Sequence, residues 1–162
     1  MIKLLVLDVD GCLTDGKIIY ASDSLETKAF NVKDGLAIVS WIRLGHQTGR
    51  KSSIVKKRAD ELGIQHLYQG VKDKEKMLRE LVGDLSLEMY EVAVIGDDLN
   101  DYKMLAIAGR SFTPNDGVSD VQELVETVLS KKGGDAAVRE MIDIIIEEND
   151  QKEQFLSLWI EE

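Results

Sequence analysis

Short runs of apolar residues alternate along the chain with stretches in which apolar residues recur every three or four positions. Two of these runs, Ile2–Val9 and Val92–Ile95, are rich in β-branched residues and leucine and end at acidic residues and glycine. Such runs are typical of strands that are buried on both faces of a parallel sheet. The same criteria predict three further short strands, Ile64–Tyr68, Arg110–Thr113 and Thr127–Leu129.

Segments with helical periodicity separate the predicted strands. Leu36, Val39 and Ile42 recur at near-helical spacing, and Gly45 follows as a C-terminal stop signal. Similar reasoning predicts helices over Asp34–Leu44, Ser52–Leu62, Lys74–Val82, Asn100–Ala108, Ala136–Glu147 and Glu153–Ile160. Strands that alternate with helices predict an α/β fold, with a Rossmann-like, mostly parallel sheet flanked by helices.

A β-hairpin is expected between the first strand and the first helix. Lys17–Tyr20 and Thr27–Val32 are two β-prone stretches that a polar segment separates. This arrangement predicts a hairpin over about residues 17–32. The chain contains no internal repeat, low-complexity segment or linker-like stretch, so we expect residues 1–162 to form a single domain.

The composition excludes several classes of protein. Apolar residues make up 44% and charged residues 31%, which is typical of a globular domain. No run approaches the roughly 18 apolar residues that cross a bilayer, and acidic residues arrive too early for a signal peptide. With 20 basic and 30 acidic residues the net charge is −10, which repels nucleic acid and anionic lipid. A single cysteine agrees with a reducing compartment, so we expect a cytoplasmic protein without nucleic-acid or membrane partners.

Acidic residues follow the two strongest predicted strands. Asp8 and Asp10 end the first, and Asp97 lies in a Gly-Asp-Asp-Leu-Asn-Asp segment after the second. Ligands of open parallel sheets bind outside the carboxyl ends of the strands, so neighbouring strands would bring these three side chains together. Carboxylates packed so closely repel one another unless a cation lies between them, and oxygen ligands favour Mg²⁺. The alternative is that these aspartates only cap turns.

Groups suited to phosphate occur in the same parts of the chain. Gly11 lets backbone N–H groups approach an anion. Thr48, Gly49 and Arg50 offer a hydroxyl, a permissive backbone and a cation. Lys74, at the start of a predicted helix, adds a compact positive charge. We expect the nearby Cys12 to be a small buried apolar residue.

Four segments resemble the motifs of the haloacid dehalogenase superfamily: Asp8–Gly16, Thr48–Arg50, Lys74 and Gly96–Asp101. Four others are similar to the family of 3-deoxy-D-manno-octulosonate 8-phosphate phosphatases: Phe30–Gly35, Arg58–Ile64, Leu67–Gly70 and Gly133–Glu140. Together they cover nearly the whole chain in one order. The resemblance implies a phosphatase that releases the free sugar acid and phosphate during lipopolysaccharide precursor biosynthesis.

The resemblance also implies residue roles. Asp8 would be the nucleophile that forms an aspartyl-phosphate, and Asp10 would act as general acid and then as general base. Thr48 and Lys74 would bind the transferring phosphoryl oxygens. The substrate-binding positions would be Gly11, Gly49 and Arg50, with Arg50 contacting the phosphate or the carboxylate of the sugar acid.

Metal binding and assembly follow from the same resemblance. The Asp8 carboxylate, the Asp10 backbone carbonyl and Asp97 would hold Mg²⁺, and Asp98 and Asp101 would support them. Similar proteins lack a separate cap domain and form homotetramers in which the hairpin roofs a neighbour's site. We therefore expect a homo-oligomer, a tetramer, whose partner molecule is a small sugar-acid phosphate.

The chain departs from the family pattern before Thr48. The family's second motif ends a buried strand, whereas here Leu44-Gly45-His46-Gln47 leads directly from a predicted helix into the motif. About four apolar residues are missing, so no strand is expected from these residues and the sheet would be rearranged unless the printed sequence omits residues. Two alternatives to the main function stay open: a nine-carbon sugar-acid phosphate as substrate, or a non-catalytic relative that binds phosphate or metal.

Overall fold

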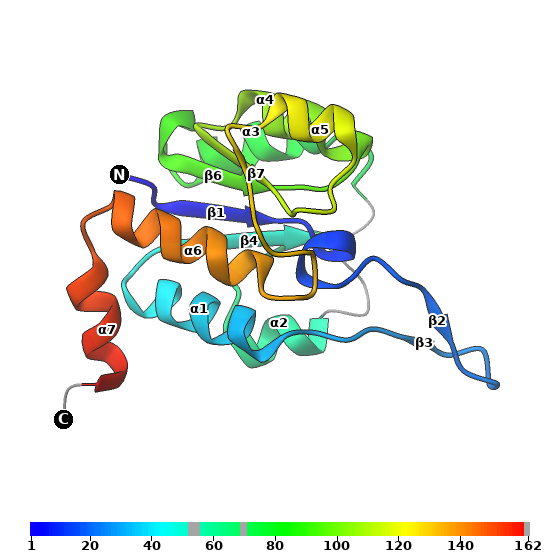
Figure 1. Cartoon of the computed structure of the whole chain (residues 1–162). Helices are drawn as coiled ribbons and strands as arrows, with labels where there is room; N and C mark the ends of the chain where they lie inside the picture. The colour runs from blue at the N-terminus through cyan, green and yellow to red at the C-terminus, as the bar shows by residue number, and fades with distance from the viewer. Residues whose placement is uncertain (52–55, 69–70, 161–162) are drawn as a thin grey trace.

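Six parallel strands form the central sheet of the computed structural model, which describes residues 1–51, 56–68 and 71–160 (Figure 1). The strand order is β5-β4-β1-β6-β7-β8, and every neighbouring pair is parallel. The bounds are β1 Leu4–Leu7, β4 Gln47–Lys51, β5 His66–Tyr68, β6 Val92–Ile95, β7 Arg110–Thr113 and β8 Thr127–Val128. The predicted Rossmann-like α/β fold is confirmed.

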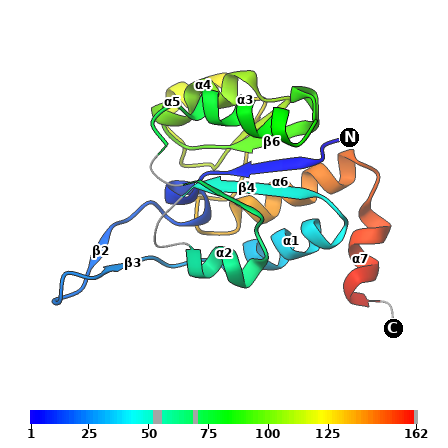
Figure 2. The same cartoon turned by 180° about the vertical axis from the view of Figure 1, so that it is seen from behind.

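Helices cover both faces of the sheet (Figures 1 and 2). One face carries α1 Val32–Arg43, α2 Lys56–Leu62, α6 Ala137–Glu148 and α7 Lys152–Ile160, and the other carries α3 Lys74–Asp84, α4 Tyr102–Ile107 and α5 Ser119–Leu124. Single helical turns lie at Met89–Glu91 and Leu99–Asp101, and a kinked turn, non-helical at Asp10 and Gly11, spans Val9–Leu13. None of the described helices is long and apolar enough to span a bilayer.

The two central strands are apolar because each contributes to two cores. Leu5 and Leu7 of β1 pack with the α1 and α6 side, whereas Leu4 and Val6 pack with the α3 and α4 side. All residues of β1 and β6 are buried. The apolar runs that predicted these strands are therefore confirmed. The six-residue α5 was not predicted, since Val121 is its only buried residue and gives no periodicity.

The hairpin is shorter than predicted. β2 (Ile19–Tyr20) and β3 (Glu26–Thr27) pair in antiparallel fashion and project from the body of the protein (Figures 1 and 2). The prediction of strand as far as Val32 was wrong, because helix α1 begins there. The side chain of Asn31 caps that helix by accepting a hydrogen bond from the Lys33 amide at 2.9 Å.

The segment that contains Thr48, Gln47–Lys51, forms the strand β4. β4 lies between β1 and β5, with Gln47 opposite Leu4 and Thr48 opposite Leu5. The link from α1 is so short that the strand is built from the motif residues themselves. Its start is fixed by hydrogen bonds from the Gln47 amide to the Lys3 carbonyl at 2.9 Å and from the Trp41 indole to the Gln47 carbonyl at 2.9 Å. The prediction that no strand forms here was wrong. The first four residues of the helix predicted over 52–62 lie outside the described residues.

Candidate active site

Two carboxylates meet where β1 and β6 end. These strands are neighbours, with Leu7 opposite Ile95, and the Asp8 amide donates to the Ile95 carbonyl at 3.2 Å. The ligand atoms of Asp8, Cys12 and Asp97 lie within 4.8 Å of one another. The predicted convergence is confirmed for Asp8 and Asp97 but not for Asp10, whose carboxylate pairs with Lys28 instead.

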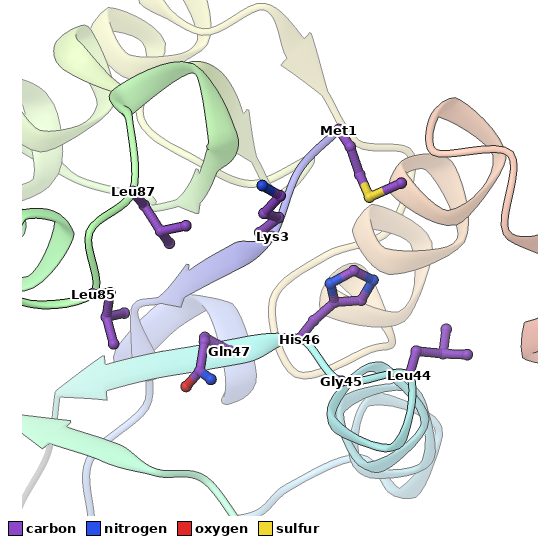
Figure 3. Close-up of a pocket in the computed structure, with 8 residues that line it drawn as sticks. All are labelled: Met1, Lys3, Leu44, Gly45, His46, Gln47, Leu85 and Leu87. Atoms are coloured by element: carbon purple, nitrogen blue, oxygen red, sulfur yellow. The ribbon is translucent and has the colours of Figure 1, made fainter.

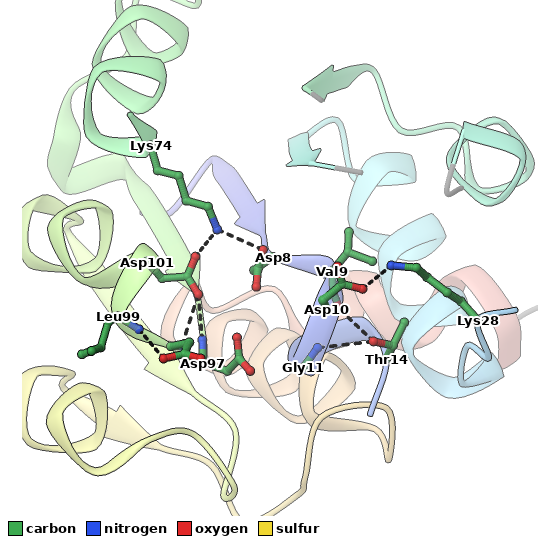
Figure 4. A network of polar contacts seen from close by, with 11 residues as sticks. Asp8, Val9, Asp10, Gly11, Thr14, Lys28, Lys74, Asp97, Leu99 and Asp101 are labelled. Carbon is green, nitrogen blue, oxygen red and sulfur yellow. Dashed lines mark hydrogen bonds and ion pairs between the residues drawn. The ribbon is translucent and has the colours of Figure 1, made fainter. Parts of the chain in front are cut away.

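Lys74 joins this pair from the start of α3 (Figure 4). Its ammonium group donates to Asp8 Oδ1 at 3.2 Å and forms an ion pair with Asp101. The Lys74 side chain is only 4% exposed and that of Asp101 is fully buried. A buried ammonium is tolerated only with such partners, so the two carboxylates fix its position.

Asp101 organises the loop after β6. Its Oδ2 accepts hydrogen bonds from the Asp97 amide at 2.9 Å and from the Asp98 amide at 3.4 Å. The exposed Asp98 accepts from the Leu99 amide at 2.7 Å, so it caps the following turn. These contacts agree with the supporting positions predicted for Asp98 and Asp101, although they do not test a role in metal binding.

Glycines allow the loops of the site to approach closely. A Cβ atom on Gly96 would lie 2.5 Å from the Cβ of Asp101, and one on Gly11 would lie 1.8 Å from Asp97 Oδ2. Gly11 also has a φ of 88°, a conformation that favours glycine. The Gly11 amide donates to Thr14 Oγ1 at 3.3 Å, so it is engaged within its own loop, and its substrate-binding role remains a prediction.

The electrostatics of the cluster are those of crowded carboxylates. Burial, followed by the charge of Asp101, raises the pKa of Asp8 to about 6, with Lys74 opposing the shift. Burial and the charges of Asp8 and Asp101 raise the pKa of Asp97 to about 8. Burial by itself lowers the pKa of Lys74, but its carboxylate partners raise it above the usual value. A divalent cation would stabilise the ionised carboxylates, and their oxygen atoms are the ligands that Mg²⁺ prefers.

Cys12 is buried, as predicted. Burial, followed by the charges of Asp8 and Asp97, raises the pKa of its thiol well above the usual value. The thiol therefore stays protonated, which makes it neither a nucleophile nor a ligand for a hard cation. The oxygen donors of this group are therefore Asp8 and Asp97.

Asp10 lies in the loop that follows β1, on the side of that loop away from Lys74 (Figure 4). Its side chain is 64% exposed and forms an ion pair with Lys28, which follows the hairpin. No sequence pattern predicts this lysine, because the contact depends on the path of the hairpin and not on a spacing. Thr14 was also missed: its hydroxyl closes the loop by accepting from the amides of Gly11 and Gly16.

Thr48 is not brought to the cluster. It lies opposite Leu5, three residues before Asp8, which corresponds to about 10 Å along the strands. The side chain is fully buried within the sheet, and its hydroxyl has no hydrogen-bond partner among the described residues. The prediction that this hydroxyl lies at the catalytic edge was wrong, because the short link to α1 sets the register of β4.

Gly49 and Arg50, the other two residues of that motif, also lie opposite β1 residues that precede Asp8. Gly49 lies opposite Val6, where a Cβ atom would come within 3.0 Å of Leu81. The absence of a side chain at Gly49 therefore allows close packing against α3, and its substrate-binding role stays a prediction. The backbone of Arg50 lies opposite Leu7, and its side chain is outside the described part of the chain.

Comparison with known proteins identifies relatives along nearly the whole chain. Residues 50–142 match the family model of haloacid dehalogenase-like hydrolases. The chain is 40% identical to the 3-deoxy-D-manno-octulosonate 8-phosphate phosphatase of Yersinia pestis over 94% of this chain and 83% of that protein. The enzyme of the same name from Escherichia coli K12 is 39% identical over 90% and 79% of the two chains.

Solved structures agree with these relatives. The 3-deoxy-D-manno-octulosonate 8-phosphate phosphatase of Moraxella catarrhalis, solved with a magnesium ion, a phosphate ion and a KDO molecule, superposes with a TM-score of 0.91 at 38% identity. The alignment covers 97% of this chain and 93% of that one. The Yersinia pestis structure gives a TM-score of 0.90 at 38% identity, with 94% and 84% covered.

Proposed function

The chain belongs to the haloacid dehalogenase-like hydrolases, and we infer that it is a Mg²⁺-dependent 3-deoxy-D-manno-octulosonate 8-phosphate phosphatase. The observation that carries this function is the meeting of Asp8, Asp97 and Lys74 at the carboxyl edge of the sheet. A nucleophilic carboxylate, a second oxygen ligand and a buried cation are the groups that phosphoryl transfer through an aspartyl-phosphate requires.

Asp8 is suited to act as the nucleophile. One of its oxygens accepts a hydrogen bond from Lys74 and its side chain is only 11% exposed. Attack of a carboxylate oxygen on phosphorus would form an aspartyl-phosphate and break the bond between phosphorus and the sugar oxygen. Lys74, held by Asp101, would stabilise the negative charge of the transferring phosphoryl oxygens.

Asp10 is the proposed proton-transfer group. In the first step it would donate a proton to the departing sugar oxygen, and in the second it would take a proton from the water that attacks the aspartyl-phosphate. Its side chain lies on the loop that follows Asp8 and is 64% exposed, so it is accessible to a bound sugar. Cleavage of the aspartyl-phosphate by water regenerates Asp8 and releases phosphate.

The residues present fit a magnesium ion. Burial and the charge of Asp101 raise the pKa of both Asp8 and Asp97, so a cation held between these two carboxylates would stabilise their ionised forms. We propose that these carboxylates and the backbone carbonyl of Asp10 hold Mg²⁺. When bound, the ion supplies Lewis-acid chemistry by neutralising phosphate charge against the nucleophile.

Phosphate binding would rest on fewer side chains than the sequence motifs suggest. Thr48 is buried inside the sheet, so its hydroxyl would take no part. Among the described residues, Lys74 is the cation next to Asp8, and it would carry the binding of the phosphoryl group. This arrangement makes Lys74 the residue on which turnover depends most after Asp8.

A homotetramer is the proposed assembly. Ile18, Tyr20 and Leu25 of the projecting hairpin are 65%, 69% and 65% exposed. A two-stranded hairpin with exposed apolar side chains is only marginally stable by itself. Packing on another protein surface would bury these side chains and stabilise it. We propose that this hairpin packs near the site of a neighbouring copy, and that the assembly acts in the cytoplasm on a precursor of lipopolysaccharide.

Phosphate release from 3-deoxy-D-manno-octulosonate 8-phosphate tests the function. Release that requires Mg²⁺, stops with EDTA and is abolished by Asp8→Asn is the expected result. Asp60→Asn, which removes only a surface ion pair on α2, is the matched control and should keep full activity. No release by folded protein would refute the proposed substrate. Faster release from the nine-carbon analogue would favour the alternative substrate.

A further inference from the structure

Lys28 connects the hairpin to the proposed proton-transfer group. We propose that Lys28 is a positioning residue that holds the carboxylate of Asp10 ready for proton transfer, an inference that rests on the proposed function. Its ammonium group forms an ion pair with Asp10 Oδ1 and lies 3.6 Å from Glu26 Oε1. Figure 4 shows the Asp10 carboxylate directed toward Lys28 and away from Lys74.

The burial of the two partners indicates which one fixes the other. The Lys28 side chain is 8% exposed, whereas that of Asp10 is 64% exposed. A buried lysine has its position set by the surrounding packing, but an exposed aspartate exchanges rotamers freely unless a partner holds it. Lys28 is therefore the fixed member of the pair, and Asp10 is the member that is positioned.

Proton transfer makes this positioning relevant to the rate. A general acid must lie within about 2.6–3.2 Å of the atom that it protonates. A displacement of 1 Å can reduce the rate of a positioned reaction by about 100-fold. Among the described residues, Lys28 is the side chain that the structure pairs with the carboxylate of Asp10.

Lys17, which precedes the hairpin, provides the comparison. Lys17 lies 3.9 Å from Asp15, and the two side chains are 77% and 54% exposed. This loose pair is solvated on both sides, and such pairs contribute little. Lys17 therefore only adds charge near the loop, whereas Lys28 is placed to position a functional group.

The test compares substrates whose leaving groups differ in their need for a proton. A sugar alkoxide must be protonated as it leaves, whereas p-nitrophenolate leaves without help, so only the second step with p-nitrophenyl phosphate needs Asp10. For Lys28→Met we expect kcat for 3-deoxy-D-manno-octulosonate 8-phosphate to fall about 100-fold, with KM changed less than about threefold. With p-nitrophenyl phosphate, the rate of the first turnover should be unchanged. Later turnovers should be slow, giving a burst of one p-nitrophenolate per site.

Further variants keep the result interpretable. Lys28→Arg should restore most of the turnover, and Lys17→Met should behave like the unmodified protein with both substrates. Lys28→Gln removes the charge but keeps a polar head beside Glu26, and it replaces the methionine variant if that one fails to fold. Equal slowing of the first turnover with both substrates, or unchanged turnover of the sugar phosphate, would overturn the proposal.

Failure of the substrate assignment would be seen separately. In that case the unmodified protein would hydrolyse p-nitrophenyl phosphate but not 3-deoxy-D-manno-octulosonate 8-phosphate. The burst produced by Lys28→Met with p-nitrophenyl phosphate would still support the positioning role, and its absence would still overturn it.

Discussion

Replacing Thr48 by valine separates the role of this residue in the fold from a role in catalysis. The side chain is fully buried in β4, and its hydroxyl has no hydrogen-bond partner among the described residues. A buried polar group left without a partner costs about 1–3 kcal/mol. Valine has nearly the same shape and a high strand propensity, so Thr48→Val removes this cost without leaving a cavity.

We therefore expect the free energy of unfolding to rise by about 1 kcal/mol or more in urea denaturation followed by circular dichroism. For a chain of this length the melting temperature should rise by about 2–4 °C per kcal/mol. Phosphate release should be unchanged within about twofold, because the hydroxyl lies about 10 Å from the level of Asp8 along the strands.

Two other threonines provide matched controls. Thr113 is also fully buried with an unpartnered hydroxyl, so Thr113→Val should stabilise the protein by a similar amount. Thr14 is 2% exposed, but its hydroxyl accepts from two amides and donates to the Val9 carbonyl, so Thr14→Val should destabilise it by about 1–3 kcal/mol. A 100-fold loss of kcat/KM in a fully folded Thr48→Val variant would refute this reasoning. It would mean that the hydroxyl contacts phosphate and that β4 lies three residues further along β1.

Three further predictions concern the site. Lys74→Met should abolish phosphate release and reduce the free energy of unfolding by about 3–5 kcal/mol in urea, since it leaves buried carboxylates without a cation; retained activity would contradict its role. In EDTA, Asp8 and Asp97 have pKa values raised from 3.8 to about 6 and about 8, so the folded chain holds more protons than the unfolded chain across that range. The free energy of unfolding should therefore fall as the pH rises from about 4 to about 8, and Mg²⁺ should reverse the fall; a rise in EDTA would contradict the crowding of the carboxylates. Inserting three apolar residues directly before Thr48 should bring it level with Asp8 and raise kcat/KM by up to about 100-fold, and an unchanged rate would show that its hydroxyl is dispensable.

The meeting of Asp8 and Asp97 could be predicted because it depends on two strong local signals. β1 and β6 are apolar throughout, and each is followed by an aspartate within two residues. Only their adjacency had to be assumed, and the sheet order confirms it. Lys74 followed from its place at the start of a helix beside the same edge.

Contacts that depend on chain path could not be predicted in this way. The pairing of Lys28 with Asp10 joins residues 18 positions apart through a hairpin with only two residues in each strand. Neither residue type nor spacing specifies how such a hairpin lies against the first loop. The burial of His46 is a similar case: its ring stacks on Trp41 at 4.1 Å and its Nε2 contacts Gln151, a residue more than 100 positions away.

The register of β4 shows why a tertiary requirement can override the local pattern. Gln-Thr-Gly-Arg-Lys has no apolar alternation and a low strand propensity, yet it forms the strand between β1 and β5. Without it, the amide and carbonyl groups along one edge of the buried β1 would lack partners, at about 1–3 kcal/mol for each group. This penalty exceeds the propensity scale, which spans about 1 kcal/mol per residue. Pairing along β1 therefore makes the segment a strand, and the short link to α1 sets its register. As a result Thr48 lies within the sheet, opposite Leu5, while Asp8, Asp97 and Lys74 lie at its carboxyl edge.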